Sequence, residues 1–282
     1  MFRGKSEVLK KLRYIIVFLI MLIPAMTVYA AEDLSIKDID EKIFLGNRCE
    51  TLEDKPGNLN VYSIISGDYD SHFKKVKGMI PNYGFTKSVY WVRFNLVNES
   101  LSQFSKVLEI AFPLLDKVQI YIFSDKDGRQ NLLQHEISGR DFSFKNRVIE
   151  HRNFVFPFTM HPEERLTFLL RIETDDGMIF PLSIWKPEYF TKRVQVEQFL
   201  FGIYYGIIIV MILYNLFIFI STRDKNYLIY ILYITFFGLF QLAMNGLAVQ
   251  YLWPDSPWWG IHANPFLIGM SALFGSYFSI RF

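Results

Sequence analysis

The side chains best suited to hold a metal ion, or to act as nucleophile and base, are the histidines and the single cysteine, Cys49. No histidine pairs with another at the i, i+4 spacing of a helical zinc site. The histidines are His72, His135, His151, His161 and His262. Cys49 can form no intrachain disulfide, and without ligand partners nearby in sequence we interpret it as a buried thiol, not a redox or metal-binding one. We expect no metal and no cofactor.

Motifs of nucleophilic and phosphate chemistry are missing as well. The sequence contains no G-x-S-x-G elbow and no phosphate-binding loop. The acidic pair Asp175 and Asp176 precedes a glycine, which is typical of a solvated turn. We therefore predict no catalytic residues, and binding is the function that remains. A net charge of +2 without a basic stripe argues against nucleic acid as a partner.

Polar and aromatic residues on the solvent-facing side of strands, and in nearby loops, are the candidates for contacting a ligand. They are Trp91, Arg93, Asp116, Arg140, Arg147 and Arg152. A structural alternative exists for three of them. Trp91 would cover the edge of the core, Arg93 would pair with a carboxylate across the sheet, and Asp116 would cap a turn.

Short β-branched and aromatic runs, separated by Gly, Asn, Asp and Pro, predict the strands that position these residues. The predicted strands are 61–65, 89–97, 107–111, 118–123, 153–158, 166–173 and 179–185. In the second strand, alternation assigns Tyr90, Val92, Phe94 and Leu96 to the core face, and Trp91, Arg93, Asn95 and Val97 to the opposite face. Because no helical periodicity separates the strands, we expect antiparallel pairing and an all-β sandwich over residues 31–187.

The N-terminus has the features of a secretory signal, residues 1–30. A basic region is followed by an apolar run from Tyr14 to Ile23. Val28 and Ala30 occupy the positions that a signal peptidase reads, so we expect cleavage after Ala30, with an uncleaved anchor as the alternative. Either way, the following domain is exported to the periplasm of a bacterial cell.

Apolar residues make up 51% of the chain, and those near the C-terminus predict three membrane helices. After a linker helix at 188–198, the predicted spans are 199–220, 227–249 and 265–281. Residues 221–226 are too few for anything but a tight turn, and Arg223 and Lys225 indicate that this turn is cytoplasmic. We expect a multi-pass protein of the cytoplasmic (inner) membrane with its N-terminal domain outside.

Small and amide side chains within the spans are candidates for helix packing. Gly202 and Gly206 form a G-x-x-x-G motif, which allows two helices to approach closely. The amides of Asn215, Gln241 and Asn245 need partners in hydrocarbon, so we expect them to face other helices. No intramembrane acid or base accompanies them, which favours packing over a transport pathway.

Several motifs carry a resemblance to a known family. In the membrane part they include Gly202-Ile203-Tyr204-Tyr205-Gly206, Leu213-Tyr214-Asn215-Leu216-Phe217, Arg223-Asp224-Lys225 and Tyr251-Leu252-Trp253-Pro254. This part resembles the opening of the bacterial seven-transmembrane receptors with diverse intracellular signalling modules. The exported part carries Val89-Tyr90-Trp91-Val92-Arg93-Phe94, Pro113-Leu114-Leu115-Asp116 and Pro181-Leu182-Ser183-Ile184-Trp185. It is similar to their jelly-roll extracellular domain type 2.

The resemblance implies a jelly-roll-like sandwich that binds a small molecule, a carbohydrate or a related compound. It also implies seven helices and a cytoplasmic output module, whereas we expect three helices and no such module here. We therefore interpret the chain as a C-terminally truncated receptor, a fragment, or a part that works with a second chain. The expected partners are the ligand, membrane lipid, and either another copy of this chain or a separate chain carrying the remaining helices.

The leading hypothesis is a sensory receptor without enzymatic activity, in which ligand binding shifts the first span through residues 187–198. The alternative is an envelope interaction protein whose sandwich binds another protein while the helices anchor it. Transport is a third hypothesis, and the predicted helices supply no polar pathway for it.

Overall fold

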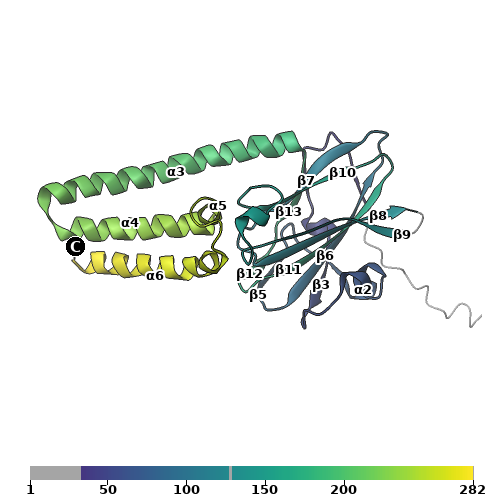
Figure 1. Cartoon of the computed structure of the whole chain (residues 1–282), viewed down its shortest axis with the longest axis horizontal. Coiled ribbons are helices and arrows are strands. Elements are labelled where there is room, and N and C mark those ends of the chain that lie inside the picture. Colours follow the sequence, from purple (N-terminus) through teal and green to yellow (C-terminus); the bar gives the residue numbers. More distant parts are fainter. Residues whose placement is uncertain (1–32, 127–128, 282) are drawn as a thin grey trace, which may run out of the picture. The chain divides into compact units, whose positions relative to one another are not determined.

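The computed structural model describes residues 33–126 and 129–281, so the predicted signal peptide lies outside the described residues. A β-sandwich is followed along the chain by a group of helices (Figure 1). The strands are β1 (Asp33–Ile36), β2 (Lys42–Phe44), β3 (Glu50–Asp54), β4 (Lys74–Lys75), β5 (Asn82–Phe85), β6 (Val89–Asn98), β7 (Phe104–Ile110), β8 (Lys117–Lys126), β9 (Arg129–Ser138), β10 (Phe154–Met160), β11 (Arg165–Glu173), β12 (Gly177–Ile179) and β13 (Leu182–Trp185).

These strands form a large sheet, a small sheet and a two-stranded ribbon. The large sheet has the order β4-β3-β6-β11-β8-β9, and β1 also pairs with β6. The small sheet has the order β10-β7-β13-β2, and β12 pairs with β5. The predicted all-β sandwich is confirmed. The pairings are antiparallel as expected, except that β1 runs parallel to β6.

The main core contains apolar side chains from both sheets and includes the predicted inner face of β6. Phe94 of β6 stacks on Phe168 of β11 with ring centroids 4.8 Å apart, and both belong to this core. Each fully buried side chain of this kind contributes roughly 1.5–3 kcal/mol. Cys49 is buried in the same core, so apolar packing takes the place that disulfides have in many exported domains.

The opposite face of β6 is also buried, which corrects the prediction that it faces solvent. Trp91 is 0% exposed and belongs to a second apolar cluster. Its cover includes residues 61–65, predicted as a strand and found as helix α2 (Val61–Ile65). Asn60 caps α2 by accepting a hydrogen bond from the N–H of Tyr62 at 2.9 Å, and Ile64 packs against the sheet. Capping and tertiary packing outweigh the β propensity of this run.

Two other strand predictions need correction. The predicted strand 179–185 is divided into β12 and β13, because Pro181 lacks the N–H that a continuous ladder requires. The whole of β9, residues 129–138, was not predicted. It pairs with β8 at the edge of the large sheet, where a strand needs no regular alternation of apolar side chains.

The helices after the sandwich are α3 (Pro187–Thr222), α4 (Lys225–Met244), α5 (Leu247–Tyr251) and α6 (Pro257–Arg281). Lys186 alone separates β13 from α3, and Pro187 occupies the first turn, where a missing N–H costs nothing. The predicted linker helix and first span form one helix of 36 residues without interruption. Its length is about 54 Å at 1.5 Å per residue.

Within the described residues, α3 and α4 are the helices long and apolar enough to cross a membrane. Their connection consists of Arg223, in a left-handed conformation with φ 61°, and Asp224, which caps α4. The chain direction therefore reverses within two residues, which agrees with the tight turn predicted from the sequence.

The two later spans differ from their predicted boundaries. The second, predicted as 227–249, is interrupted after Met244 by Asn245 and Gly246, and α5 follows. The third, 265–281, is the C-terminal part of α6, which is not among the two apolar candidate helices. A third span therefore stays a prediction. In the helical group, α4 lies between α3 and α6 (Figure 1).

Replacing Gly139 by alanine is expected to destabilise the sandwich by roughly 3 kcal/mol. Gly139 has a φ of +145°, and a Cβ there would lie 1.9 Å from the carbonyl oxygen of Asp116. Gly84 is the matched control, because its φ is +68° but its Cβ would meet nothing within 4 Å. Gly84→Ala should cost only about 1 kcal/mol. Urea unfolding of the full chain in detergent measures both variants, and equal losses would contradict the predicted clash.

Candidate functional site

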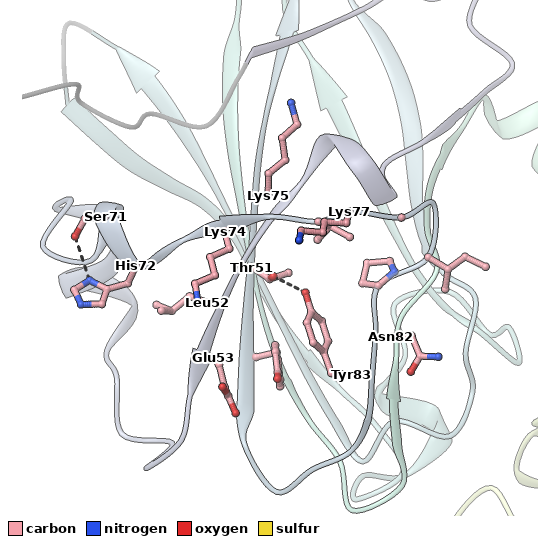
Figure 2. A pocket seen from close by; sticks show the side chains of 15 residues that line it. Thr51, Leu52, Glu53, Ser71, His72, Lys74, Lys75, Lys77, Asn82 and Tyr83 are labelled. Atoms are coloured by element: carbon pink, nitrogen blue, oxygen red, sulfur yellow. Dashed lines mark hydrogen bonds between the residues drawn. The ribbon is translucent and has the colours of Figure 1, made fainter.

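A cleft of about 700 Å³ lies at the β3–β4 edge of the large sheet. Its walls come from β3, from residues 71–77 around β4, and from the connection that leads into β5 (Figure 2). Its polar and aromatic lining residues include Thr51, Glu53, His72, Lys74, Lys77, Asn82, Tyr83 and Tyr90.

Strand register decides which side chains enter the cleft. Thr51 lies opposite Lys74 in one pairing and opposite the core residue Val92 in the other. Side chains opposite one another project from the same face of a sheet, so Thr51 and Lys74 share the inner face. Lys75 lies opposite Glu50 and points away from Lys74, as Figure 2 shows.

Two tyrosines form an aromatic floor. The rings of Tyr83 and Tyr90 stack with centroids 4.1 Å apart, and the Tyr83 ring also stacks on Phe180 at 5.9 Å. The hydroxyls of Tyr83 and Thr51 are 2.5 Å apart. Burial, together with the nearby Glu53 carboxylate, raises the pKa of Tyr90 to about 12, and burial also raises the pKa of Tyr83. Both phenols therefore stay protonated and can donate hydrogen bonds at neutral pH.

Several of the remaining lining groups are polar and accessible. The side chains of Lys74, Lys77 and Asn82 are exposed, and Glu53 accepts a hydrogen bond from Ser88 at 2.8 Å. The cleft therefore places aromatic side chains beside hydroxyl, amide and ammonium groups. No group of three metal-binding side chains occurs within residues 33–126 and 129–281.

None of the six predicted ligand residues lines this cleft. Trp91 is buried, and its indole N–H points at Asp54 at 3.4 Å. Arg93 pairs with Glu50 of the neighbouring strand at 3.0 Å and with Asp70, and its guanidinium lies 4.1 Å from the Phe73 ring. Both residues make the contacts of the structural alternative, and ligand contact by them stays a prediction.

Asp116 and Arg140 organise a turn at the end of the sandwich. Asp116 accepts hydrogen bonds from Arg140 at 2.7 and 3.0 Å and from the backbone N–H of Asp175 at 2.7 Å. Arg140 also pairs with Asp176 at 2.6 Å. Of the acidic pair that the sequence placed in a solvated turn, Asp176 is thus held by a buried arginine, and Asp175 is exposed.

Within the described part of the chain, Arg147 is buried and binds backbone carbonyls in place of a carboxylate. Its Nη1 donates to the carbonyl oxygens of His151, Arg152 and Asn153 at 2.7, 2.8 and 3.2 Å. Burial lowers the pKa of Arg147 to about 9. Because one guanidinium binds three consecutive carbonyl oxygens, it holds the backbone of residues 151–153 in a defined loop. The side chains of this loop point away from Arg147.

The side chains of residues 151–153 point toward α3, the first helix after the sandwich. They meet it at the outer face of the small sheet. Glu109 of β7 is 1% exposed and accepts hydrogen bonds from Asn153 at 2.7 Å and from the Trp185 indole at 2.9 Å. Arg193 of α3 completes the site by pairing with the same carboxylate. His151 packs its ring edge-on against Phe190 of α3, with centroids 5.3 Å apart.

Arg152 extends this network to α4. It pairs with Glu197 at 2.9 Å, and Glu197 also pairs with Arg193 at 2.7 Å. A second nitrogen of Arg152 is 3.5 Å from the carbonyl oxygen of Asn245 at the end of α4. The next residue, Gly246, approaches Pro113 so closely that a Cβ would lie 2.6 Å away. We call the contacts of Glu109, Arg152, Arg193, Glu197 and Asn245 the junction.

A second contact joins the sandwich to the connection between α5 and α6. Lys145 pairs with Asp255 at 2.7 Å, and Ser143 donates a hydrogen bond to Asp255 at 3.0 Å. The backbone N–H of Phe144 donates to the carbonyl oxygen of Pro254 at 2.8 Å. The sandwich therefore contacts α3, the end of α4 and the loop before α6.

The residues predicted to pack helices together make different kinds of contact. A Cβ at Gly202 or Gly206 would meet nothing within 4 Å, so the G-x-x-x-G motif is not a helix contact among the described residues. Asn215 donates to the carbonyl oxygen of Met211 in its own helix at 2.8 Å. Asn245 donates to the Tyr205 hydroxyl of α3 at 3.0 Å. The backbone carbonyl oxygen of Gln241 accepts a hydrogen bond from the backbone N–H of Asn245.

Sequence reasoning missed the cleft residues and most of the junction. The cleft had one signal, the Lys74-Lys75-Val76-Lys77 run shortly before Tyr83. The junction also had one, because Glu109 interrupts the apolar strand 107–111 and an acid in a buried strand requires a partner.

Two family models match this chain, one over the sandwich and one over the helices. The family model of the 7TMR-DISM extracellular 2 domain matches residues 46–186, which include the cleft. The family model described as 7TM diverse intracellular signalling matches residues 197–282. A search of curated proteins found no match to this chain.

We predict that His151 makes the folded chain less stable as the pH falls from 6.5 toward 4. Its Nδ1 accepts the N–H of Asn153 at 3.1 Å, and burial lowers its pKa from 6.5 to about 4. Between these values the unfolded chain binds the proton and the folded chain does not. Stability is therefore complete above pH 6.5, and the loss has a slope of up to about 1.4 kcal/mol per pH unit.

Urea unfolding at a series of pH values measures this slope, with His151→Asn as the comparison. Asparagine can still accept the N–H two residues later but does not titrate. In this pH window, the variant should take up one proton fewer on unfolding than the native chain does. Identical slopes for the two proteins would contradict the assignment.

Proposed function

Since the chain belongs to the 7TMR-DISM family of membrane sensory receptors, with an extracellular domain ahead of a membrane domain, we propose that its sandwich binds a carbohydrate or related small molecule and relays binding to the helices. The site of binding in this proposal is the β3–β4 cleft. The relay is the junction, and no catalytic step is involved.

The observation that carries the proposal is the buried carboxylate of Glu109. It joins β7, the loop before β10 and α3 through Asn153, Trp185 and Arg193. A buried charge cannot lose its partner without a large penalty, on the order of 3–5 kcal/mol. A shift of the small sheet would therefore move α3, or exchange one arrangement of partners for another.

The form of α3 supports relay. Only Lys186 separates the sheet from the helix, and the helix continues without interruption for 36 residues. Val107, Val155 and Trp185 of the small sheet pack with Phe190 of α3 in one apolar cluster. A rotation imposed at this cluster would be carried along the helix axis, because a continuous helix bends little within a few turns.

The remaining parts of the proposal concern location and partners. Export by the N-terminal signal, and the Arg223-Asp224-Lys225 turn on the cytoplasmic side, would place the protein in the inner membrane with several spans. Lipid would surround α3 and α4. Another copy of the chain, or a separate chain, would supply further helices and the output module.

A second candidate function is binding of another envelope protein by the sandwich. Exposed apolar side chains beside the cleft favour it, namely Met79, Ile80 and Phe85, which are 62%, 54% and 86% exposed. Crosslinking in membranes distinguishes the two functions. A specific protein adduct at Phe85, with no saccharide binding, would favour the interaction module.

The relay is tested by Arg152→Gln in the full chain in lipid nanodiscs. A panel of oligosaccharides is first titrated by calorimetry, and hydrogen exchange is then followed in the presence and absence of a saccharide that binds. In the native chain, binding should change exchange at residues 190–198 and 245–248. In Arg152→Gln this change should fall at least about 3-fold, because the link between Glu197 and the end of α4 is lost.

Saccharide affinity should change by less than about 2-fold in this variant, since Arg152 lies outside the cleft. Lys192→Gln, which removes an exposed charge next to Arg193 on α3, is the control and should preserve the exchange response. An unchanged response in Arg152→Gln would refute the relay. An inert sandwich across the panel would refute saccharide sensing.

A further inference from the structure

We propose that the β3–β4 cleft selects an anionic saccharide, a sugar ring that carries a carboxylate, phosphate or sulfate group. This inference rests on the proposed function and specifies its ligand class. It depends on the distribution of charge around the cleft and not on the aromatic floor, which a neutral sugar would use equally.

Cations predominate among the side chains that line the cleft. Lys74 and Lys77 face a single lining glutamate, Glu53, while the third lining lysine, Lys75, points away from Lys74. Lys74 enters from the inner face of β4, opposite Thr51. Lys77 follows β4 on the connection to β5, so the two ammonium groups reach the cleft from different segments.

Nearby carboxylates outside the lining are already engaged. Glu50 and Asp70 both pair with Arg93, which is buried on the opposite face of the sheet from Lys74. Arginine pairs of this type hold carboxylates in fixed positions through charge-assisted hydrogen bonds. These two acids are therefore directed away from the cleft and do not balance Lys74 and Lys77.

Glu53 lies two residues beyond Thr51 on β3 and shares its face of the sheet. It is opposite Tyr90 in the strand pairing and accepts a hydrogen bond from Ser88. A ligand in the cleft would thus meet one carboxylate and the two ammonium groups of Lys74 and Lys77. This excess of positive charge favours a ligand that carries an anionic group, and a neutral ring gains nothing from it.

The test is calorimetric titration of the full chain in nanodiscs with matched pairs of probes. The pairs are trigalacturonate and its methyl ester, a sulfated disaccharide and its unsulfated form, and glucose 6-phosphate and glucose. In at least one pair the anionic member should bind roughly 10-fold more tightly than its neutral match, corresponding to about 1.4 kcal/mol. The pair that responds distinguishes carboxylate, sulfate and phosphate.

Charge variants locate the effect. The double variant Lys74→Gln/Lys77→Gln should weaken the anionic probe about 5-fold or more, while Lys37→Gln/Lys55→Gln, which removes the same charge from exposed positions outside the cleft, should change it less than about 2-fold. Glu53→Gln should strengthen binding about 2- to 3-fold, because it removes a repulsive charge. Increased affinity is a result that partial misfolding would not produce.

The possible results distinguish failure of this inference from failure of the proposed function on which it rests. Equal binding of neutral and anionic members, or weaker binding of the anionic ones, overturns charge selection and leaves saccharide sensing in place. Equal losses in the two double variants overturn the assignment to the cleft. Failure of every saccharide to bind overturns both proposals.

Discussion

The buried carboxylate of Glu109 is the constraint on which the sandwich and the helices jointly depend. It is 1% exposed on the outer face of the small sheet, where an unpaired charge would be strongly destabilising. Its three partners, Asn153, Trp185 and Arg193, come from the loop before β10, from β13 and from α3. The requirement to satisfy one charge therefore fixes where α3 begins and how the loop before β10 is placed.

The basic residues around this carboxylate have separate tasks. Arg147 holds the backbone of the loop from inside, Arg193 neutralises Glu109, and Arg152 carries the network to Glu197 and the end of α4. Charge-assisted hydrogen bonds hold these groups in place, although Nε of Arg147 and Oδ1 of Asn153 have no hydrogen-bond partner among the described residues. In the proposed relay, such a network would respond to strain by switching partners and not by gradual deformation.

The cleft and the junction lie in different sheets of the same sandwich. The cleft is at the β3–β4 edge of the large sheet, whereas the junction is on the outer face of the small sheet. The core between the sheets is closely packed, with Tyr90, Phe94, Phe168 and Phe180 among its members. Tyr90 and Phe180 belong to this core and also contact Tyr83 in the cleft, so the aromatic floor is continuous with the packing that separates the two sites.

By itself, the sequence determined the architecture. Alternation along β6 identified the core face, the apolar runs identified α3 and α4, and the motifs identified the family, because these signals depend on neighbours a few residues apart. Tertiary structure alone decided that 61–65 is a helix over Trp91 and that Arg147 and Arg152 serve the junction. It alone brought Lys74, Lys77 and Tyr83 into one cleft. These features depend on which distant segments meet, and local periodicity carries no information about such contacts.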